Sequence, residues 1–209
     1  MGIMIFFRKQ AKRNWFRELI IQSLKTGTAD SAIICSGFFQ EFFKTSTYQA
    51  SNEGKFSSVV KSKKISITTI GIHNGNWITP YKNFRNNLLL KGIKIKAKIA
   101  KKFHWHAKIF ILKKKSVPIF AIVGSSNITR NAFSKSVPFN YESDVVIWLD
   151  SKRKLNSLMK KLVTTNNNFQ DEIIVTEYNA DNNFGLSIQD RLNQLEKDLN
   201  IAELEELSD

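Results

Sequence analysis

The sequence predicts an α/β domain with a layered mixed β-sheet flanked by helices. Three observations lead to this fold class. Helix-like and strand-like segments alternate along the chain, as they do in layered α/β domains. The chain has 209 residues, which is long enough to bury a sizeable core. Its 42% hydrophobic content and 16 phenylalanines are typical of a folded protein.

The first half of the chain contains helical and extended patterns in turn. Apolar residues at helical spacing indicate helices, short apolar runs indicate strands, and Gly92 is placed to end one helix. Strict alternation puts Lys94, Lys96 and Lys98 on one face of a half-exposed strand. The elements expected here are a helix near 13–24, a buried strand over 31–39, a helix within 36–44, a strand at 65–73, a helix near 80–92 and the strand at 92–100.

The second half continues this alternation and then changes character. Near residues 164–170 the chain turns polar and its charge changes sign, which predicts a basic domain at 1–169 and an acidic tail at 170–209. In the tail, Ser187 and Asp190 form a capping-box pattern before a short amphipathic helix, which we expect to pack on the body of the protein or on a partner. The remaining elements expected are strands at 106–112, 118–124 and 143–149, a short helix beginning within 127–133 and a helix at 151–163.

The two parts of the chain carry opposite charge. The formal net charge is +14, and residues 170–209 contain eleven acidic and two basic residues. Removing these from the totals of 32 basic and 18 acidic residues leaves 30 basic and 7 acidic residues in 1–169, a net charge of +23. A basic surface attracts polyanions, because lysine and arginine release counterions from phosphates. Nucleic acid is the favoured partner, an anionic membrane surface is the competitor, and a lysine-rich composition alone is the simplest alternative.

The chain contains one cysteine, Cys35, so an intrachain disulfide is excluded. The opening MGIMIFFRKQAKR places apolar residues before charged ones, the reverse of a signal peptide, and the apolar run is too short to span a bilayer. We therefore expect a cytoplasmic protein without a membrane partner.

Polar residues alternate at the start of the strand expected at 106–112. Because side chains alternate across a strand, His104, His106 and Lys108 share one face, at intervals of about 7 Å. An imidazole attacks phosphorus or moves a proton, and a nearby ammonium stabilises the negative charge that develops on the phosphoryl oxygens. The alternatives are a solvent-exposed polar face, or two zinc ligands at His104 and His106, for which the remaining histidine is His73.

Three short motifs occur in order along the chain. They are His106-Ala-Lys108, Gly124-Ser-Ser-Asn127 after a strand, and Asn140-Tyr-Glu142 before a strand. Together they resemble the HxK, GSxN and NxE elements of the phospholipase D superfamily, over residues 103–149. Among its branches, the sequence is most similar to the nucleases, including those found in restriction enzymes. The resemblance implies a phospholipase D-like fold and phosphodiester hydrolysis that needs no metal or other cofactor.

The resemblance also implies a role for each matching residue. His106 would be the nucleophile that forms a phosphohistidine, while Lys108 and Asn127 would hold the non-bridging oxygens. Ser125 would add a hydroxyl to this pocket or support its turn, and Glu142 would orient an imidazole. The alternatives are helix capping for Ser125 and Asn127, and a surface carboxylate for Glu142.

Two features set this chain apart from the family pattern. The family commonly has an aspartate five residues after the motif lysine, where this chain has Lys113. That difference weakens a lipid-hydrolase interpretation more than a nuclease one. The family also pairs two HxK elements in one active site, and this chain has one. The resemblance therefore implies a homodimer in which each chain supplies one His106 to a site on the two-fold axis.

We interpret the sequence as that of a dimeric, metal-independent phosphodiesterase acting on nucleic acid, with DNA favoured over RNA. A role in restriction or defence would require a partner protein that supplies sequence specificity, because the chain contains no separate recognition motif. Two alternatives remain open. One is a nucleic-acid-binding or assembly module with the same fold and little turnover, and the other is a lipid phosphodiesterase.

Further nucleic-acid contacts are expected outside the motifs. Trp15, Trp77 and Trp105 supply candidate stacking surfaces for bases, although tryptophan in a domain of this size is more often in the core. The acidic tail is expected to fold over the basic cleft and compete with nucleic acid, or to dock on a partner. An alternative role for the lysines of residues 92–100 is to protect a sheet edge from aggregation. The lysines expected to follow the phosphate backbone are Lys94, Lys96, Lys98, Lys113, Lys114 and Lys115.

Overall fold

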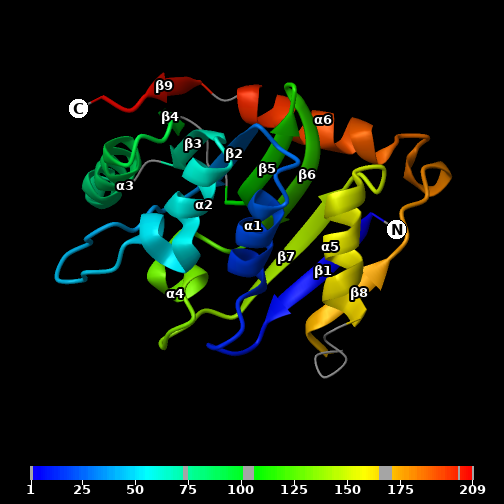
Figure 1. Cartoon of the computed structure of the whole chain (residues 1–209), viewed down its shortest axis with the longest axis horizontal. Helices are drawn as coiled ribbons and strands as arrows, with labels where there is room; N and C mark the ends of the chain where they lie inside the picture. Colours follow the sequence, from blue (N-terminus) through cyan, green and yellow to red (C-terminus); the bar gives the residue numbers. More distant parts are fainter. Residues whose placement is uncertain (1, 73–74, 101–105, 165–170, 202, 209) are drawn as a thin grey trace.

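The strands of the protein form one continuous sheet. The computed structural model describes residues 2–72, 75–100, 106–164, 171–201 and 203–208. Within these residues, nine strands pair in the order β8-β1-β7-β6-β5-β2-β3-β4-β9 (Figure 1). β2, β3 and β4 are parallel to one another and the other neighbours are antiparallel, which confirms the predicted mixed sheet. The strands are β1 (Ile3–Arg8), β2 (Ser31–Ser36), β3 (Ser66–Ile72), β4 (Ile95–Ala100), β5 (Lys108–Lys114), β6 (Val117–Gly124), β7 (Glu142–Trp148), β8 (Ile173–Thr176) and β9 (Leu204–Glu206).

Helices cover both faces of this sheet. Figure 1 shows α1 and α5 in front of the strands and α6 along the upper margin of the molecule. Helices α1 to α5 contribute to the larger core cluster, whereas α6 packs on the opposite face through Leu192 and Leu199. The helices are α1 (Trp15–Lys25), α2 (Phe56–Ser62), α3 (Ile78–Leu90), α4 (Arg130–Phe133), α5 (Arg153–Thr164) and α6 (Ile188–Ile201), with 3-10 helices η1 (Ala50–Lys55), η2 (Gly75–Trp77) and η4 (Asp181–Asn183).

The central hairpin of β5 and β6 is apolar because both of its faces are covered. Phe110 contributes to the larger core and the adjacent Ile109 to the core beneath α6. This alternation follows from the opposite directions of neighbouring side chains on a strand. The hairpin turns at Lys115 and Ser116, whose φ angles are +48° and +65°, and two-residue hairpin turns commonly require positive φ at both positions. The motif lysine and the turn therefore lie at opposite ends of β5.

One predicted element is wrong, and the strands β1, β8 and β9 and the helix α2 are absent from the predicted elements. The helix expected within residues 36–44 does not form, and this segment instead makes isolated bridges from Phe39 to Ile128 and from Glu41 to Gln49. Phe39 and Glu41 are buried by these distant partners, which outweighs their local helical spacing. Among the strands that were not predicted, β1 has residues that alternate between half-buried and buried positions. The other expected helices and strands are present, with ends shifted by a few residues.

The acidic tail is part of the same layered body. β8 and β9 form the two edges of the sheet, and α6 covers one of its faces. The capping box is confirmed, because the Ser187 backbone N–H donates to Asp190 Oδ2 at 2.8 Å and the Asp190 N–H donates to Ser187 Oγ at 3.1 Å. The change of charge near residue 170 thus falls inside one sheet. In the described part of the chain, no helix is both long and apolar enough to cross a membrane.

Candidate active site

The motif residues meet at the end of the sheet where β5 and β7 begin and β6 ends. Lys108, Gly124 and Asp144 form one cross-strand row, so the side chains of Lys108 and Asp144 project from the same face on either side of a glycine. A Cβ atom at Gly124 would overlap Asp144 Oδ1 and would lie 2.5 Å from the Ser143 carbonyl oxygen. Glycine is therefore required here for Lys108 and Asp144 to approach each other.

Lys108 carries a buried charge beside an exposed imidazole. Its side chain is 4% exposed, and its ammonium donates a hydrogen bond of 2.7 Å to the backbone carbonyl of His106. Burial lowers the pKa of Lys108 below its ordinary value, and the negative charges of Glu142 and Asp144 partly oppose this shift. His106 lies just before β5 and is exposed. The two predicted catalytic residues of the HxK motif are thus adjacent, with the imidazole open to solvent.

The NxE and GSxN motifs are in direct contact. The Ser125 hydroxyl is hydrogen-bonded to the Glu142 carboxylate, and the Asn140 side-chain amide donates to Glu142 Oε1 at 3.0 Å. The Ser143 N–H donates to Ser125 Oγ at 3.1 Å. Glu142 is 6% exposed, so the surface-carboxylate interpretation is wrong. Among the described residues, the hydrogen-bond partners of this carboxylate are Ser125 and Asn140.

Asn127 is held by the end of β2. The Ser36 hydroxyl lies 3.2 Å from Asn127 Oδ1, and it accepts a hydrogen bond of 3.0 Å from the backbone N–H of Ile128. A Cβ atom at Gly37 would lie 3.3 Å from Asn127 Oδ1 and 4.0 Å from Lys108 Cε. The loop after β2 therefore borders both residues that are predicted to hold phosphate oxygens.

Asp144 is a site residue that sequence analysis missed. It is 3% exposed, and its Oδ2 accepts a hydrogen bond of 2.8 Å from the Ser126 hydroxyl inside the GSSN turn. Burial, reinforced by the negative charge of Glu142, raises the pKa of Asp144 to about 7, while the Ser126 hydroxyl acts in the opposite direction. The signal was present in NYESD, because a second acid two residues after Glu142 must share its strand face.

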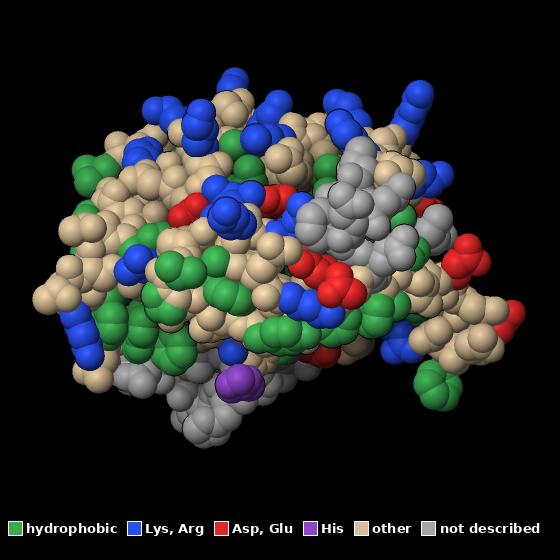
Figure 2. Space-filling model, turned by 90° about the horizontal axis from the view of Figure 1, so that it is seen from below, with side chains coloured by type: hydrophobic (Ala, Val, Ile, Leu, Met, Phe, Trp, Pro, Cys, Tyr) green, Lys and Arg blue, Asp and Glu red, His purple; other side chains and the backbone are tan. Residues whose placement is uncertain are grey.

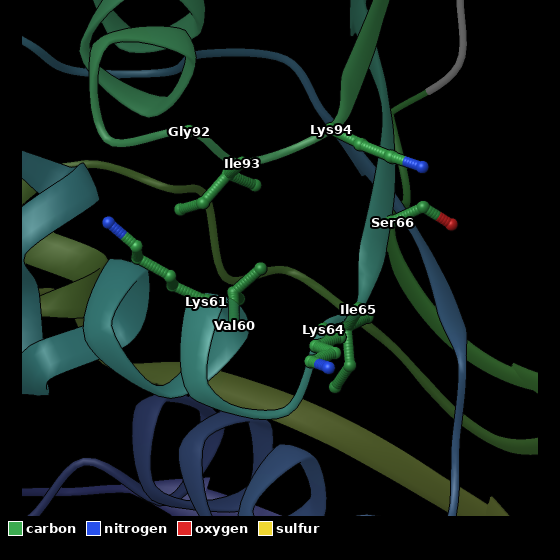
Figure 3. Close-up of a pocket in the computed structure, with 8 residues that line it drawn as sticks. All are labelled: Val60, Lys61, Lys64, Ile65, Ser66, Gly92, Ile93 and Lys94. Atoms are coloured by element: carbon green, nitrogen blue, oxygen red, sulfur yellow. The ribbon is translucent and has the colours of Figure 1, made fainter.

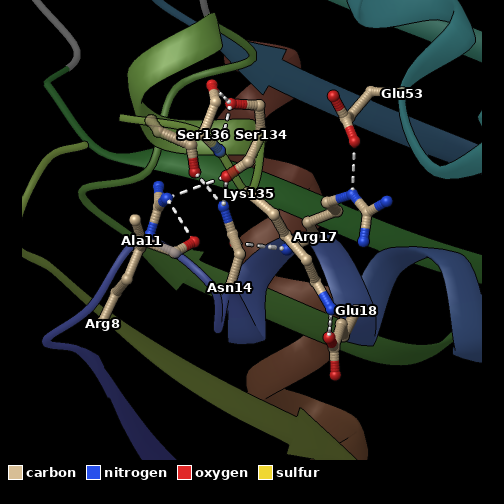
Figure 4. A network of polar contacts seen from close by, with 10 residues as sticks. Arg8, Ala11, Asn14, Arg17, Glu18, Glu53, Ser134, Lys135 and Ser136 are labelled. Atoms are coloured by element: carbon tan, nitrogen blue, oxygen red, sulfur yellow. Dashed lines mark hydrogen bonds and ion pairs between the residues drawn. The ribbon is translucent and has the colours of Figure 1, made fainter. Parts of the chain in front are cut away.

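Arg8 is a second missed residue, and it supports the segment that follows the GSSN turn (Figure 4). It is 3% exposed and lies opposite Glu142 across the β1–β7 pair. Its guanidinium donates to the carbonyl oxygens of Asn131 at 2.6 Å and Ser134 at 2.8 Å, and the Asn14 amide donates to Ser134 O at 3.0 Å. Burial lowers the pKa of Arg8, and Glu142 opposes this shift. Alternate residues of β1 are buried, and Arg8 falls on the buried face at the end of this strand. An arginine that continues the apolar alternation was the signal in the sequence.

The arrangement suits the binding of an anion and its attack by an imidazole. Two buried cations and two buried carboxylates lie at this end of the sheet, together with the hydroxyl of Ser125 and the amide of Asn127, and His106 is exposed there. Fixed ammonium, hydroxyl and amide donors stabilise negative charge most strongly where water is excluded. Figure 2 views the molecule from the lower end in Figure 1 and shows a histidine side chain at the surface.

The predicted nucleic-acid-binding lysines lie elsewhere on the sheet. Lys113 and Lys114 are at the far end of β5, about 20 Å from the start of the strand by its rise per residue. Lys113 is ion-paired with Glu196 of α6, and Lys114 Nζ lies 3.7 Å from Asp30 Oδ2. Lys115 lies in the hairpin turn and is exposed. The tail therefore pairs with one of these lysines through α6.

The lysines of β4 are also separate from the motif residues. Lys96 is exposed and Lys98 is half-buried on β4, three places from β5 in the sheet. Lys94, just before β4, borders a pocket of about 250 Å³ with Lys61 and Lys64 (Figure 3). Figure 3 shows that these three ammonium groups point in different directions and do not converge on one ligand position. His73, His104 and Trp105, which the sequence singled out, lie outside the described residues.

A comparison with known protein families matches residues 61–174 to the family described as NgoFVII restriction endonuclease N-terminal PLD domain. This range is just over half of the chain. The chain belongs to this family. The matched range contains all five predicted catalytic residues of the PLD domain, whereas β1 with Arg8 and the helix α6 lie outside it. A search of curated proteins found no significant sequence match.

Three solved structures align with this chain at low sequence identity. The phosphatidylserine synthase of Haemophilus influenzae Rd KW20 aligns at 12% identity and a TM-score of 0.48, over 98% of this chain and 47% of its own. The polyphosphate kinase of Porphyromonas gingivalis aligns at 7% identity and a TM-score of 0.45, over 78% of this chain and 26% of its own. TrmBL2, an archaeal chromatin protein, aligns at 15% identity and a TM-score of 0.38, over 75% of this chain and 52% of its own. The chain thus spans between about a quarter and a half of these proteins.

Proposed function

We propose that this PLD-domain protein is a metal-independent phosphodiesterase that cleaves nucleic acid, and that its substrate is DNA. The observation that supports the proposal is that the three motifs lie at one end of the sheet, where Lys108 and Glu142 are buried and His106 is exposed. The family match to a restriction endonuclease domain and the net charge of +23 on residues 1–169 support nucleic acid as the substrate.

The proposed reaction proceeds by two displacements at phosphorus. His106 attacks the phosphodiester, an N–P bond forms, and the P–O bond to one sugar oxygen breaks as a second imidazole protonates that oxygen. A water molecule, deprotonated by the same second imidazole, then attacks the phosphohistidine and releases the other strand end with its phosphate. Lys108, Asn127 and Ser125 stabilise the charge on the non-bridging oxygens in both steps.

The second imidazole comes from another copy of the chain in this proposal. The sequence contains one HxK motif, and His106 is exposed, so it is accessible to a partner subunit. A two-fold contact would place two copies of His106 in one site, because such contacts juxtapose the same residues from both chains. Sequence specificity for restriction or defence would come from a partner protein or an additional domain.

Cleavage assays in EDTA test this proposal. We expect the purified protein to cut DNA more efficiently than RNA of the same sequence, and we expect His106→Ala to abolish cutting while leaving salt-sensitive binding intact. The matched control is Lys114→Ala at the far end of β5, assayed on an oligonucleotide too short to reach that end. Nucleic-acid binding without cleavage by the parent protein would support a binding module instead. Hydrolysis of a phosphatidyl substrate in place of DNA would support a lipid phosphodiesterase.

A further inference from the structure

The loop after β2 places aromatic rings at the protein surface. Phe38, Phe43 and Trp77 form a cluster in which the ring centroids of Phe43 and Trp77 are 4.0 Å apart with planes inclined by 10°, and those of Phe38 and Trp77 are 4.7 Å apart. All three side chains are partly exposed, and the nearby Phe42 is 47% exposed. Phe39 shows the contrast, because it is 1% exposed in the core. The rings of this aromatic cluster are thus only partly buried.

The aromatic cluster borders the candidate active site. Ser36, which lies 3.2 Å from Asn127 Oδ1, also donates a hydrogen bond of 2.8 Å to the Phe38 carbonyl. Between them, Gly37 lies close to both site residues, because a Cβ atom there would be 3.3 Å from Asn127 Oδ1 and 4.0 Å from Lys108 Cε. Trp77 follows β3, and β3 is the second neighbour of β5 in the sheet. The cluster also includes Phe38, which is two residues after Ser36, so the cluster adjoins the loop that borders Asn127 and Lys108.

The backbone of this loop is held in a costly conformation. Phe42 and Lys44 have φ angles of +55° and +53°, which residues with a Cβ atom adopt at an energetic cost. Backbone hydrogen bonds keep the loop in place, from Phe42 N to Tyr48 O and from Ser46 N to Phe43 O, each at 3.0 Å. Such strained backbone is concentrated at ligand-binding sites. This loop carries Phe42, which is 47% exposed, and Phe43, which is partly exposed.

We infer that the aromatic cluster stacks on an unpaired base of the nucleic-acid strand whose phosphodiester lies at His106 and Lys108. This inference rests on the proposed function and specifies its substrate. Aromatic rings stack on any base, because every base has a flat π face. In a duplex these faces are covered by neighbouring base pairs, so the substrate must be single-stranded or locally opened at the site.

Charge favours this ligand over a purely apolar one. The Lys44 ammonium lies 5.3 Å from the centroid of the Phe43 ring, so a basic group and an aromatic face are presented together. A nucleotide has an anionic phosphate and a flat base, and it satisfies both groups at once. Surfaces that bind single strands combine basic grooves with aromatic rings in this way.

The test measures equilibrium binding in a His106→Ala background, which prevents cleavage. The probes are a single-stranded oligonucleotide, the same strand with abasic positions, and the matching duplex. We expect Trp77→Leu to weaken binding of the intact single strand by about 5- to 150-fold, and to change duplex and abasic-strand binding by less than about twofold. Trp77→Phe should restore most of the affinity, because it restores a ring. Phe184→Leu, at an exposed ring outside the cluster, is the matched control and should change nothing.

The outcomes separate this inference from the function on which it rests. Equal weakening of all three probes by Trp77→Leu, or no weakening of any, would overturn the aromatic cluster as a base-stacking site while leaving the nuclease proposal intact. If the parent protein binds none of the probes at low salt, the proposed function fails, and the inference fails with it. Thermal unfolding of each variant checks that it remains folded.

Discussion

The two ends of the β5–β6 pair contain lysines in opposite environments. At one end, Lys108 is 4% exposed and lies in one row with Asp144. At the other end, Lys114 and Lys115 are exposed, and Lys113 pairs with Glu196. A buried charge acts through a low dielectric on whatever lies beside it, whereas an exposed charge is screened by water and salt. The position of a lysine on the strand, more than its proximity in sequence to a motif, therefore decides whether its charge acts strongly on a neighbouring group.

The largest expected difference between the two ends is in catalysis. Lys108→Met removes the buried ammonium and keeps an unbranched side chain, so we expect the cleavage rate to fall about 100- to 1000-fold through lost stabilisation of the phosphoryl oxygens. The matched variant Lys114→Met should cleave a short oligonucleotide within about twofold of the parent rate. Single-turnover rates in EDTA measure both variants. Equal losses would mean that the two ends do not differ in the way proposed.

A second difference is the response of stability to pH at the site end. Asp144 has a pKa of about 7 in the folded protein, well above its value of 3.8 when exposed, so the folded state holds this proton more tightly than the unfolded state. Its contribution to stability is complete below pH 3.8 and is lost as pH rises through 7, with a limiting slope of about 1.4 kcal/mol per pH unit. We expect Asp144→Asn to remove this loss. Urea unfolding at pH 5 and pH 8 measures the free energy of unfolding of both proteins. An equal loss of stability in the parent and in Asp144→Asn would contradict the raised pKa of Asp144.

A third difference concerns backbone geometry at the two ends. Gly124→Ala should destabilise the protein by about 1–3 kcal/mol, because the new methyl group overlaps Asp144 and the Ser143 backbone. Ser116→Gly in the hairpin turn should instead stabilise it by up to about 1 kcal/mol, because glycine adopts the φ of +65° without steric cost. Chemical denaturation measures both free energies of unfolding. A destabilised Ser116→Gly variant would show that the turn conformation is wrong.

The smallest expected effect is on salt dependence. If Lys114 and Lys115 contact phosphates of a long duplex, replacing each with alanine should reduce the slope of log affinity against log salt by about 0.9. A duplex too short to reach the far end of β5 should show no change. The affinity of the double variant is measured over a series of salt concentrations with the long and the short duplex. A change with the long duplex alone indicates phosphate contacts at the far end of β5. An equal change of the slope with the long and the short duplex would contradict binding of the duplex along β5.

Much of the site end could be predicted because its information is local. HxK, GSxN and NxE each lie at a strand end, and side-chain alternation assigns Lys108 and Phe110 to one face. The contacts of Arg8 and Ser36 could not be predicted in this way, because their partners are 91 to 126 residues away. Strand order decides which of these segments meet, and periodicity alone does not determine strand order.

The least predictable regions are those in which tertiary burial decides the local structure. Residues 36–44 have helical spacing, but Phe39 and Glu41 are drawn into the core by segments near Ile128 and Ser51. The acidic tail has a change of charge that resembles a domain boundary, yet it supplies both sheet edges and α6. Charge predicts partners and not fold, which is why the tail appeared separate in sequence.

The stereochemistry of cleavage tests whether His106 forms a covalent bond to phosphorus. Each in-line displacement inverts the configuration at phosphorus, so two successive displacements retain it. The measurement uses a DNA substrate with a single-configuration phosphorothioate at the cleaved position, cut in ¹⁸O-labelled water in the presence of EDTA. The account predicts retention of configuration. Inversion would show that water attacks the phosphodiester directly, and it would contradict the role assigned to His106.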